Sequence, residues 1–138
     1  MRKPSGRNYG FTLTEILIAV AIVAILASIS VPAYKSYMIK VRRSDAHVAL
    51  TRFAMAMERQ YVRDSTYNVS PTVAVVFQDL SDEGFYRMNW GTVTTTTFIL
   101  FAIPSGVQAD DTECGQLTLN QLGAKGITGT QTVAHCWR

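Results

Sequence analysis

The stretch from Gly10 to Tyr37, GFTLTEILIAVAIVAILASISVPAYKSY, decides the fold of this 138-residue chain. Between Phe11 and Ala33 it contains one charged residue, Glu15. A helix rises about 1.5 Å per residue, so this segment is long enough to cross the roughly 30 Å hydrocarbon core of a bilayer. The 105 residues after Ala33 are enough for one further domain with a small core.

The formal net charge of +3 comes from the beginning of the sequence. The three basic residues that make up this excess all precede Phe11: Arg2, Lys3 and Arg7. A chain that began at Phe11 would have ten basic and ten acidic side chains, arranged as a basic segment over 35–63 and an acidic one over 64–138. Nucleic-acid-binding proteins are usually net basic, so this neutral sum argues against DNA as a partner.

The two cysteines, Cys114 and Cys136, are 22 residues apart. An even number of cysteines beside a membrane-targeting segment predicts a disulfide in an oxidising compartment. Closing a loop of this size contributes about 3 kcal/mol of stability in the chain-entropy model. A zinc site that adds His47 and His135 is the alternative, but the spacing matches no common zinc motif. We expect neither a metal nor a cofactor.

The first segments come in a different order from those of an ordinary secretory signal, in which cleavage follows the apolar run. Here the polar, basic segment MRKPSGRNYG ends at Gly10, and the apolar run comes after it. The absence of a side chain at Gly10 suits a narrow protease subsite. No small-x-small site flanked by polar residues follows the run, although AILASIS leaves cleavage there open. We therefore expect the apolar helix to stay on the mature protein.

The same stretch resembles the type III signal of type IV pilins. The resemblance rests on Gly10, Phe11 and Glu15 at this spacing, followed by an apolar helix that ends near Pro32 and Tyr34. It implies that a prepilin peptidase cuts between Gly10 and Phe11 and methylates the Phe11 amine. It also implies that Glu15 pairs with the free amine of a neighbouring subunit, so that cleavage controls assembly.

Physical arguments support roles for Glu15 and Pro32. A carboxylate on a lipid-facing helix costs a few kcal/mol, so Glu15 needs a partner, and the positive end of the helix dipole near Phe11 helps to stabilise it. The alternative is that Glu15 only reaches the headgroups, since it lies close to the membrane edge. Pro32 removes a backbone hydrogen bond and is expected to kink the helix.

The expected organisation has three parts: a leader over 1–10 that is removed, a transmembrane and assembly helix over 11–33, and a pilin globular domain over 34–138 that includes the second half of the helix. The leader favours a cytoplasmic N-terminus, but basic residues such as Lys35 and Lys40 flank the other end, so the cysteines decide the orientation. We expect a single-pass protein of the bacterial inner membrane before assembly and a subunit of a cell-surface pilus afterwards.

Beyond the apolar segment, Gly and Pro are absent from Ala33 to Arg63, which predicts that the helix continues as an amphipathic one. Its core stripe is expected to consist of Met, aromatic and aliphatic residues: Tyr34, Tyr37, Met38, Val41, Leu50, Phe53, Met57 and Tyr61. We expect a loop over 65–84, with an apolar patch at Val73 to Phe77, and then three strands. The expected strands span 85–90, 95–103 and 116–120. The predicted fold class is α+β, with a long helix packed on a small antiparallel sheet and a C-terminal disulfide loop.

Three acids, Asp110, Asp111 and Glu113, lie between the second and third expected strands. Clustered carboxylates can bind calcium, but a solvated turn is the expected structure here.

The C-terminal stretch CGQLTLNQLGAKG…CW resembles the end of PilE-like pilins, a group that includes minor pilins. Together with the N-terminal signal, the resemblance covers roughly the first 40 and the last 25 residues. Glycines at 123 and 126 fit tight turns, and Trp137 could pack over the disulfide. One departure is Ala24, where many pilins have a glycine, and it puts local melting of the helix in doubt because Gly loosens a helix by about 1 kcal/mol relative to Ala.

The resemblance implies a structural subunit, of the minor kind, in a type IV pilus used for surface motility, adhesion or DNA uptake. Its expected partners are other pilin subunits, the prepilin peptidase and the pilus assembly machinery. A pseudopilin of a type II secretion system is an alternative, although that family generally lacks the disulfide loop. A DNA-binding uptake pilin is another, in which phosphates would contact basic residues and bases would stack on aromatic ones: Lys40, Arg42, Arg43, Lys125, Tyr86 and Trp137. We do not expect an enzyme, because no nucleophile elbow, metal pair or phosphate loop is present.

Overall fold

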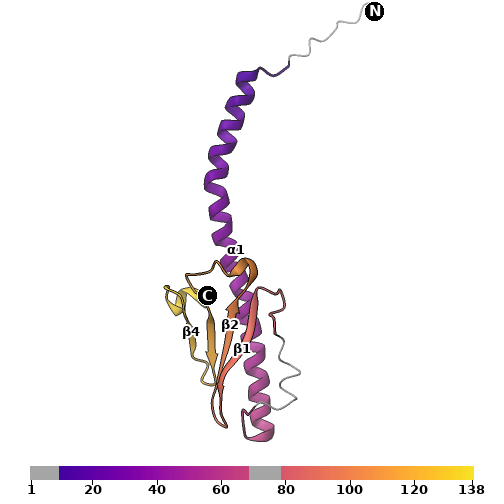
Figure 1. Cartoon of the computed structure of the whole chain (residues 1–138), viewed down its shortest axis with the longest axis vertical. Helices are drawn as coiled ribbons and strands as arrows, with labels where there is room; N and C mark the ends of the chain where they lie inside the picture. The colour runs from indigo at the N-terminus through magenta and orange to yellow at the C-terminus, as the bar shows by residue number, and fades with distance from the viewer. Residues whose placement is uncertain (1–9, 69–78) are drawn as a thin grey trace, which may run out of the picture. The chain divides into compact units, whose positions relative to one another are not determined.

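The computed structural model describes residues 10–68 and 79–138 of the chain. The chain divides into two compact units between Tyr37 and Met38, inside a single helix, α1, which runs Leu13–Asp64 (Figure 1). This helix is 52 residues long and passes through Pro32. The predicted long helix is therefore confirmed, while the kink at Pro32 stays a prediction. We call residues 38–138 the head.

Four strands in the head form one antiparallel sheet in the order β1-β2-β3-β4 (Figure 1). They are β1 Tyr86–Val93, β2 Phe98–Pro104, β3 Leu117–Asn120 and β4 Lys125–Ile127. The expected antiparallel sheet is confirmed, and β2 lies between two other strands, as its apolar sequence indicates. The sequence does not predict β4, because its three residues include Gly126 and lie where turns are expected.

The second strand starts later than its sequence predicts. Thr94 and Thr97 form the turn that joins β1 to β2, with the Thr94 amide donating to the Thr97 carbonyl at 2.9 Å. The threonines before Phe98 therefore belong to a hairpin turn, in which the Thr94 hydroxyl accepts the amides of Thr96 and Thr97. The Thr94 and Thr97 hydroxyls also lie 2.7 Å apart.

The core of the head lies between α1 and one face of the sheet. Buried residues alternate along the strands, as the two-residue period of a strand requires. The largest members of this core are Leu50, Phe53, Met57, Tyr67, Tyr86, Met88, Phe98, Leu100, Leu117 and Leu119. Each such side chain contributes about 1.5–3 kcal/mol when it is removed from water.

The predicted core stripe on α1 is correct in its second half and wrong in its first. Leu50, Phe53 and Met57 are buried, but Tyr34 and Val41 are 64% and 45% exposed. Tyr37, between these two residues in the stripe, is exposed as well. The reason is that the buried residues of α1 begin only at Arg43, although the helical spacing of apolar residues starts earlier.

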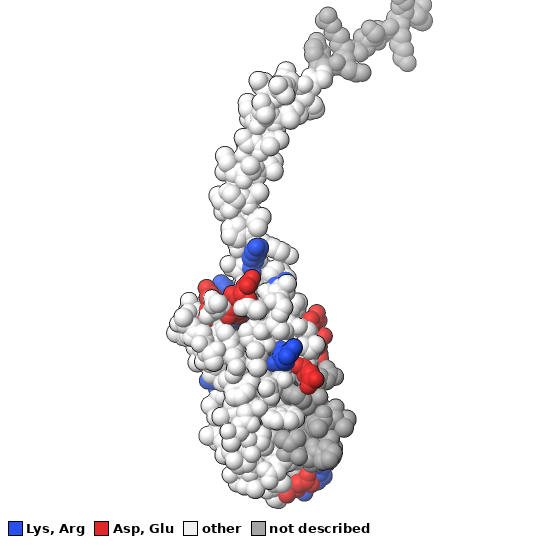
Figure 2. Space-filling view, viewed as in Figure 1, with Lys and Arg blue, Asp and Glu red and all other residues white. Residues whose placement is uncertain are grey.

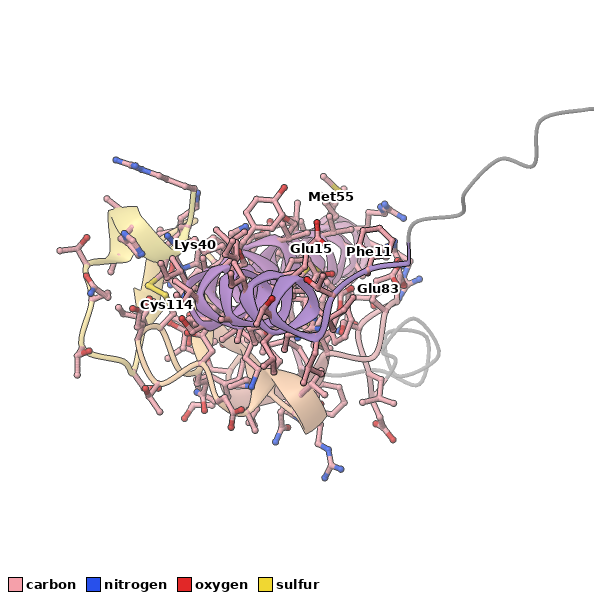
Figure 3. The ribbon with its side chains drawn as sticks, turned by 90° about the horizontal axis from the view of Figure 1, so that it is seen from above. Phe11, Glu15, Lys40, Met55, Glu83 and Cys114 are labelled. Carbon is pink, nitrogen blue, oxygen red and sulfur yellow. A yellow bond between two sulfur atoms is a disulfide. The ribbon has the colours of Figure 1, made fainter. Side chains whose placement is uncertain are left out.

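The disulfide between Cys114 and Cys136 is present, with 5.7 Å between the two Cα atoms, and it is the yellow bond beside the Cys114 label in Figure 3. It replaces the zinc alternative, since neither sulfur is free to bind a metal. The loop closes tightly at Gly129, where an added Cβ would lie 2.1 Å from the Glu113 carbonyl oxygen. Two short helices, η1 Gly106–Gln108 and α3 Val133–Cys136, are not predicted by the sequence.

The loop expected over 65–84 has one regular contact in its described part, a bridge between Leu80 and Arg87 on β1. The apolar patch expected at Val73 to Phe77 lies outside the described residues.

Candidate functional site

The start of α1 is closed by a reciprocal pair of side-chain hydrogen bonds. Thr12, directly before the helix, accepts the Glu15 amide at its Oγ1 (3.3 Å). The Glu15 carboxylate accepts the Thr12 amide in turn, at 3.5 Å. This arrangement is a capping box, which satisfies amide groups that have no carbonyl partner in the first turn of a helix. Before any neighbouring subunit is present, Glu15 therefore has a local partner.

The two residues that flank the expected cleavage bond lie outside the helix. Phe11 is 80% exposed, and a Cβ added at Gly10 would meet no atom within 4 Å. The fold itself therefore makes no steric demand for glycine at position 10. Cleavage at this bond, methylation of Phe11 and the charge pair of Glu15 stay predictions.

Among the described residues, α1 is the one helix that is long and apolar enough to cross a membrane. None of the side chains in its most apolar window is buried within the chain. The exposed large apolar side chains of this part are Leu13, Ile16, Leu17, Ile18, Val20, Ile22, Val23, Ile25, Leu26, Ile29 and Val31. An apolar surface of this extent needs lipid or protein against it.

In the head, an ion pair between α1 and the segment after β2 is almost fully buried. Arg43 donates from Nε and Nη2 to the two carboxylate oxygens of Asp111, each at 2.7 Å. Asp111 also accepts the Cys114 amide at 3.2 Å and Gln108 Nε2 at 3.3 Å. The hydrogen bond to Asp111 is the main reason that the pKa of Arg43 is raised, although burial acts in the opposite direction.

This ion pair corrects the expectation of a solvated turn at the three acids. Asp110 is exposed as expected, but Asp111 is buried, and the Glu113 carboxylate lies 3.4 Å from Arg43 Nη2. No group of three or more His, Cys, Asp or Glu residues in 10–68 and 79–138 is placed to hold a metal ion. Local sequence patterns do not indicate the pair, because its members are 68 residues apart.

Other cations of the head pair with acids at its surface. Arg52 bonds Asp82 at 2.7 Å, and Arg63 bonds Asp64 at 2.8 Å. Figure 2 shows one face of the head, on which blue and red atoms lie next to each other rather than in large patches of one sign. Exposed pairs of this kind contribute little to stability, because water and salt screen them. Their main effect here is to neutralise these cations.

Trp137 joins the disulfide segment to α1. Its ring stacks on that of His47 with 4.7 Å between centroids, and its Nε1 donates to the Gly126 carbonyl at 3.2 Å. The Lys125 ammonium lies 5.0 Å from the indole centroid, and His47 Nε2 is 3.1 Å from the Cys136 carbonyl oxygen. His47 and Lys125 thus occupy ring surface of Trp137 on which a base would have to stack.

We expect His47 to make the head less stable in acid. Burial is the largest cause that lowers the pKa of His47, and its contact with the Cys136 carbonyl opposes this only in part. The folded head therefore favours the neutral ring, while the unfolded chain takes up the proton first. The free energy of unfolding should fall as the pH falls from about 7 through the unfolded pKa of about 6.5.

Urea unfolding of the full chain in a neutral detergent can measure this effect. Both tryptophans, Trp90 and Trp137, lie in the head, so their fluorescence reports its unfolding. The variant His47→Phe keeps a flat ring against the indole but cannot titrate, so it should lose less stability between about pH 7.5 and about pH 5. An equal loss in both proteins would contradict the role of His47.

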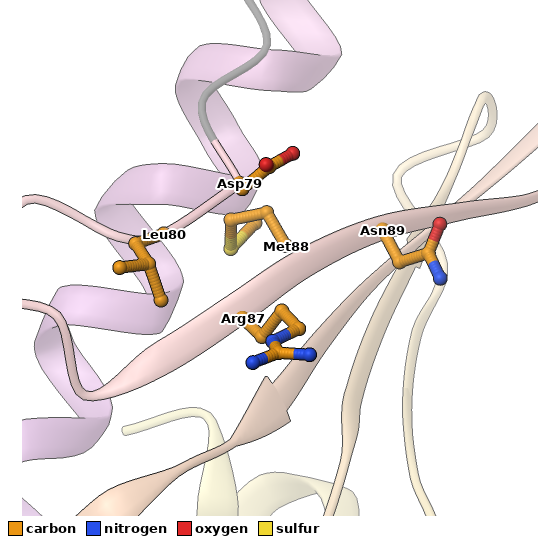
Figure 4. Close-up of a pocket in the computed structure, with 5 residues that line it drawn as sticks. All are labelled: Asp79, Leu80, Arg87, Met88 and Asn89. Carbon is orange, nitrogen blue, oxygen red and sulfur yellow. The ribbon is translucent and has the colours of Figure 1, made fainter.

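One open hollow of about 540 Å³ lies between β1 and the segment that precedes it (Figure 4). It is lined by Asp79, Leu80, Arg87, Met88 and Asn89. The Met88 amide donates to the Asp79 carbonyl at 2.9 Å, which fixes this segment on the edge of β1. Among the described residues that line it, one carboxylate and one guanidinium carry charge, and there is no nucleophile with a neighbouring base. We assign no chemistry to this hollow.

Comparisons with known protein families match two parts of the chain. Residues 5–31 match the prokaryotic N-terminal methylation motif. Residues 32–118 match a family described as type IV minor pilin ComP, DNA uptake sequence receptor. The second match covers well over half of the chain and includes α1 from Pro32 onward and the strands β1 and β2.

Individual relatives agree with these matches. The type IV major pilin protein PilE of Neisseria gonorrhoeae is 33% identical over 91 residues, which are 63% of this chain and 54% of PilE. The type IV major pilin protein PilA of Myxococcus xanthus is 34% identical over 62 residues, which are 45% of this chain and 28% of PilA. The chain therefore spans about half the length of PilE and 28% of the length of PilA.

A solved structure shares the fold. The non-core minor pilin PilV of Neisseria meningitidis superimposes with a TM-score of 0.57 at 27% identity, covering 70% of this chain and 93% of PilV. The helix, the sheet and the N-terminal motif thus agree with the sequence matches, and the chain belongs to the type IV minor pilin ComP family.

Proposed function

We propose that this chain is a minor subunit of a type IV pilus and that it assembles through α1 after a prepilin peptidase removes residues 1–10. The apolar segment 11–33 would hold it in the inner membrane, with a cytoplasmic N-terminus and the head, including the disulfide, on the oxidising side. Membership of a family of structural subunits supports a structural role rather than an enzymatic one.

The observation that carries this proposal is the apolar surface at the start of α1, none of which is buried within the chain. In the precursor, lipid would cover this surface. In a filament, the same side chains would pack on other pilin subunits, so subunits could leave the bilayer without exposing apolar area to water. The methylation motif over 5–31 supports processing at the beginning of this segment.

A second exposed surface on α1 supports assembly through the helix. Four apolar residues at a seven-residue spacing stay exposed on the part of α1 that belongs to the head. They are Val41, Val48, Met55 and Val62, with 45%, 52%, 53% and 84% exposure, and we call them the exposed row. Residues seven apart lie on nearly the same side of a helix, so the row offers one continuous apolar strip. A helix of another subunit would fit this strip.

Replacing Glu15 tests the assembly mechanism. We expect Glu15→Ala to leave the chain in the inner membrane but to lower its amount in sheared pili at least about tenfold. The variant would leave the amine of a neighbouring subunit buried without its partner, and a cost of about 1.4 kcal/mol already corresponds to tenfold. Quantitative mass spectrometry of pili and of membranes measures the two pools. Normal incorporation of this variant would rule out the charge pair.

The variant Glu15→Gln separates the charge from the cap. Glutamine also completes a capping box with Thr12, so it keeps the hydrogen bonds seen at the helix start. If the negative charge is what matters, Glu15→Gln should fail as Glu15→Ala does. If Glu15→Gln assembles normally, the carboxylate acts only as a cap.

A second candidate function is the reception of DNA at the cell surface, which the description of the matched family favours. The net charge of the mature chain does not decide this question, since charges act where they are unpaired. Base stacking is disfavoured, because Tyr86 is fully buried and Trp137 is engaged by His47 and Lys125. The head would therefore hold DNA mainly through its phosphates.

A further inference from the structure

The basic side chains of the head are unevenly paired. In the described part of the chain, three of them lie within 4 Å of a carboxylate: Arg43, Arg52 and Arg63. Residues 1–9 and 69–78 contain no Asp or Glu, so they cannot supply further acidic side chains. The cations of the described head that have no carboxylate partner are Lys40, Arg42, Arg59, Arg87, Lys125 and Arg138.

Two of these unpaired cations meet at one place. Lys40 on α1 and Arg138 after α3 line a hollow of about 140 Å³, together with Arg43, His135 and Cys136. A third unpaired cation, Lys125, lies over the ring of Trp137, the neighbour of Arg138 in the chain. The residues far apart in sequence are brought together here by the contacts that dock the disulfide segment on the helix.

The charge around the hollow is positive after its acids are counted. Arg43 is neutralised by Asp111, which bonds it from both carboxylate oxygens. Glu113 lies 3.4 Å from Arg43 Nη2 and 4.0 Å from His135 Nε2, so it opposes one of the two remaining cations. Counted over side chains, Lys40 and Arg138 together thus leave one net positive charge beside the hollow.

We propose that this hollow binds a backbone phosphate of duplex DNA through Lys40 and Arg138. The proposal rests on the role in DNA reception given above. An arginine fork can bind two phosphate oxygens at once, and a lysine adds a mobile point charge, so the pair suits one phosphate group. A contact of this kind positions the head on the duplex without reading its bases.

The test is the salt dependence of duplex binding by the full chain in a neutral detergent, followed by fluorescence anisotropy of a labelled duplex. Each phosphate contact contributes a slope of about −0.9 to log K against log salt concentration, which corresponds to about eightfold in affinity at 0.1 M salt. We expect the double variant Lys40→Gln/Arg138→Gln, which removes this one phosphate contact, to bind roughly eightfold more weakly, with a slope reduced by about 0.9. The loss should be the same for duplexes of different sequence.

Two further variants make the test directional. Arg59→Gln removes an exposed cation of the same helix that lies outside the lining of the hollow, so it should bind DNA like the wild type. Glu113→Gln removes a negative charge beside the hollow and leaves both bonds from Arg43 to Asp111 in place, so it should bind DNA more tightly. A general loss of folding cannot produce a gain in one variant and a loss in the other.

The outcomes separate this site from the wider function. If the wild type binds no duplex at low salt, the proposed DNA reception is wrong, and the site is wrong with it. If the wild type binds but the double variant binds equally well, only the site is wrong. If the double variant keeps its DNA affinity but no longer binds vesicles that contain phosphatidylglycerol, the hollow holds a lipid phosphate and our proposal is overturned.

Discussion

Replacing Asp111 by alanine should lower the free energy of unfolding of the head by about 3–5 kcal/mol, because it leaves the guanidinium of Arg43 buried without its partner. The side chains of Arg43 and Asp111 are 4% and 0% exposed, so water cannot replace the lost bonds without opening the fold. The Cys114 amide would lose an acceptor as well, directly beside the disulfide. Urea unfolding, followed by tryptophan fluorescence, measures the loss.

The double variant Arg43→Met/Asp111→Leu is the matched control. Apolar side chains of similar volume remove both charges at once, and such replacements of a buried ion pair are often neutral or stabilising. We therefore expect this variant to be several kcal/mol more stable than Asp111→Ala. If Asp111→Ala costs under about 1 kcal/mol, the pair behaves like an exposed one, and its assigned role in the head is wrong.

Replacing Gly10 by leucine should leave essentially all of the chain uncut and should abolish its incorporation into pili. The fold does not account for this loss, since position 10 is exposed and a side chain there would meet no atom within 4 Å. The cut removes ten residues and three positive charges, so the two forms separate on an isoelectric gel. Mass spectrometry of the N-terminus identifies the cut and the methyl group on Phe11.

Asn8→Leu provides the control for added bulk in the leader. It places the same side chain two residues earlier, and we expect normal cleavage. If both variants are uncut, the peptidase requires small side chains throughout this part of the leader and not at position 10 in particular. If Gly10→Leu is cut between residues 10 and 11 and enters pili, the proposed processing is wrong.

The features of the fold that follow from local periodicity could be predicted from the sequence. The helix, the buried spacing of Leu50, Phe53 and Met57, and the central strand β2 each depend on residues that are close in the chain. At the helix start, the spacing of Gly10, Phe11 and Glu15 identifies the segment by resemblance. Its capping box also has a local signal, because Thr12 and Glu15 are three residues apart.

The features that depend on distant residues could not be predicted in this way. The pairing of Arg43 with Asp111 and the contact of His47 with the Cys136 carbonyl join positions 68 and 89 residues apart. Single-sequence patterns describe faces of helices and strands, but they do not say which charges meet when the faces pack. The strand β4 could not be predicted for another reason, since three residues are too few to show a two-residue period.

Close packing on the outer face of the sheet gives a further example. A Cβ added at Gly91 on β1 would lie 2.6 Å from the ring of Phe101 on β2. The glycine therefore makes room for an aromatic ring on the neighbouring strand, and a glycine inside a strand also often marks a bulge. The register of β1 shifts between Trp90 and Val93, directly at this position.

The exposed row on α1 has a geometric consequence for any helix that packs on it. Its members, from Val41 to Val62, repeat every seven residues, while a straight α-helix has 3.6 residues per turn. The row therefore drifts around α1 by about 20° in each repeat. A partner that stays in contact with all four side chains must follow this drift and wind around α1 in a left-handed sense. The handedness of that contact is thus already determined by the spacing of four side chains in a single subunit.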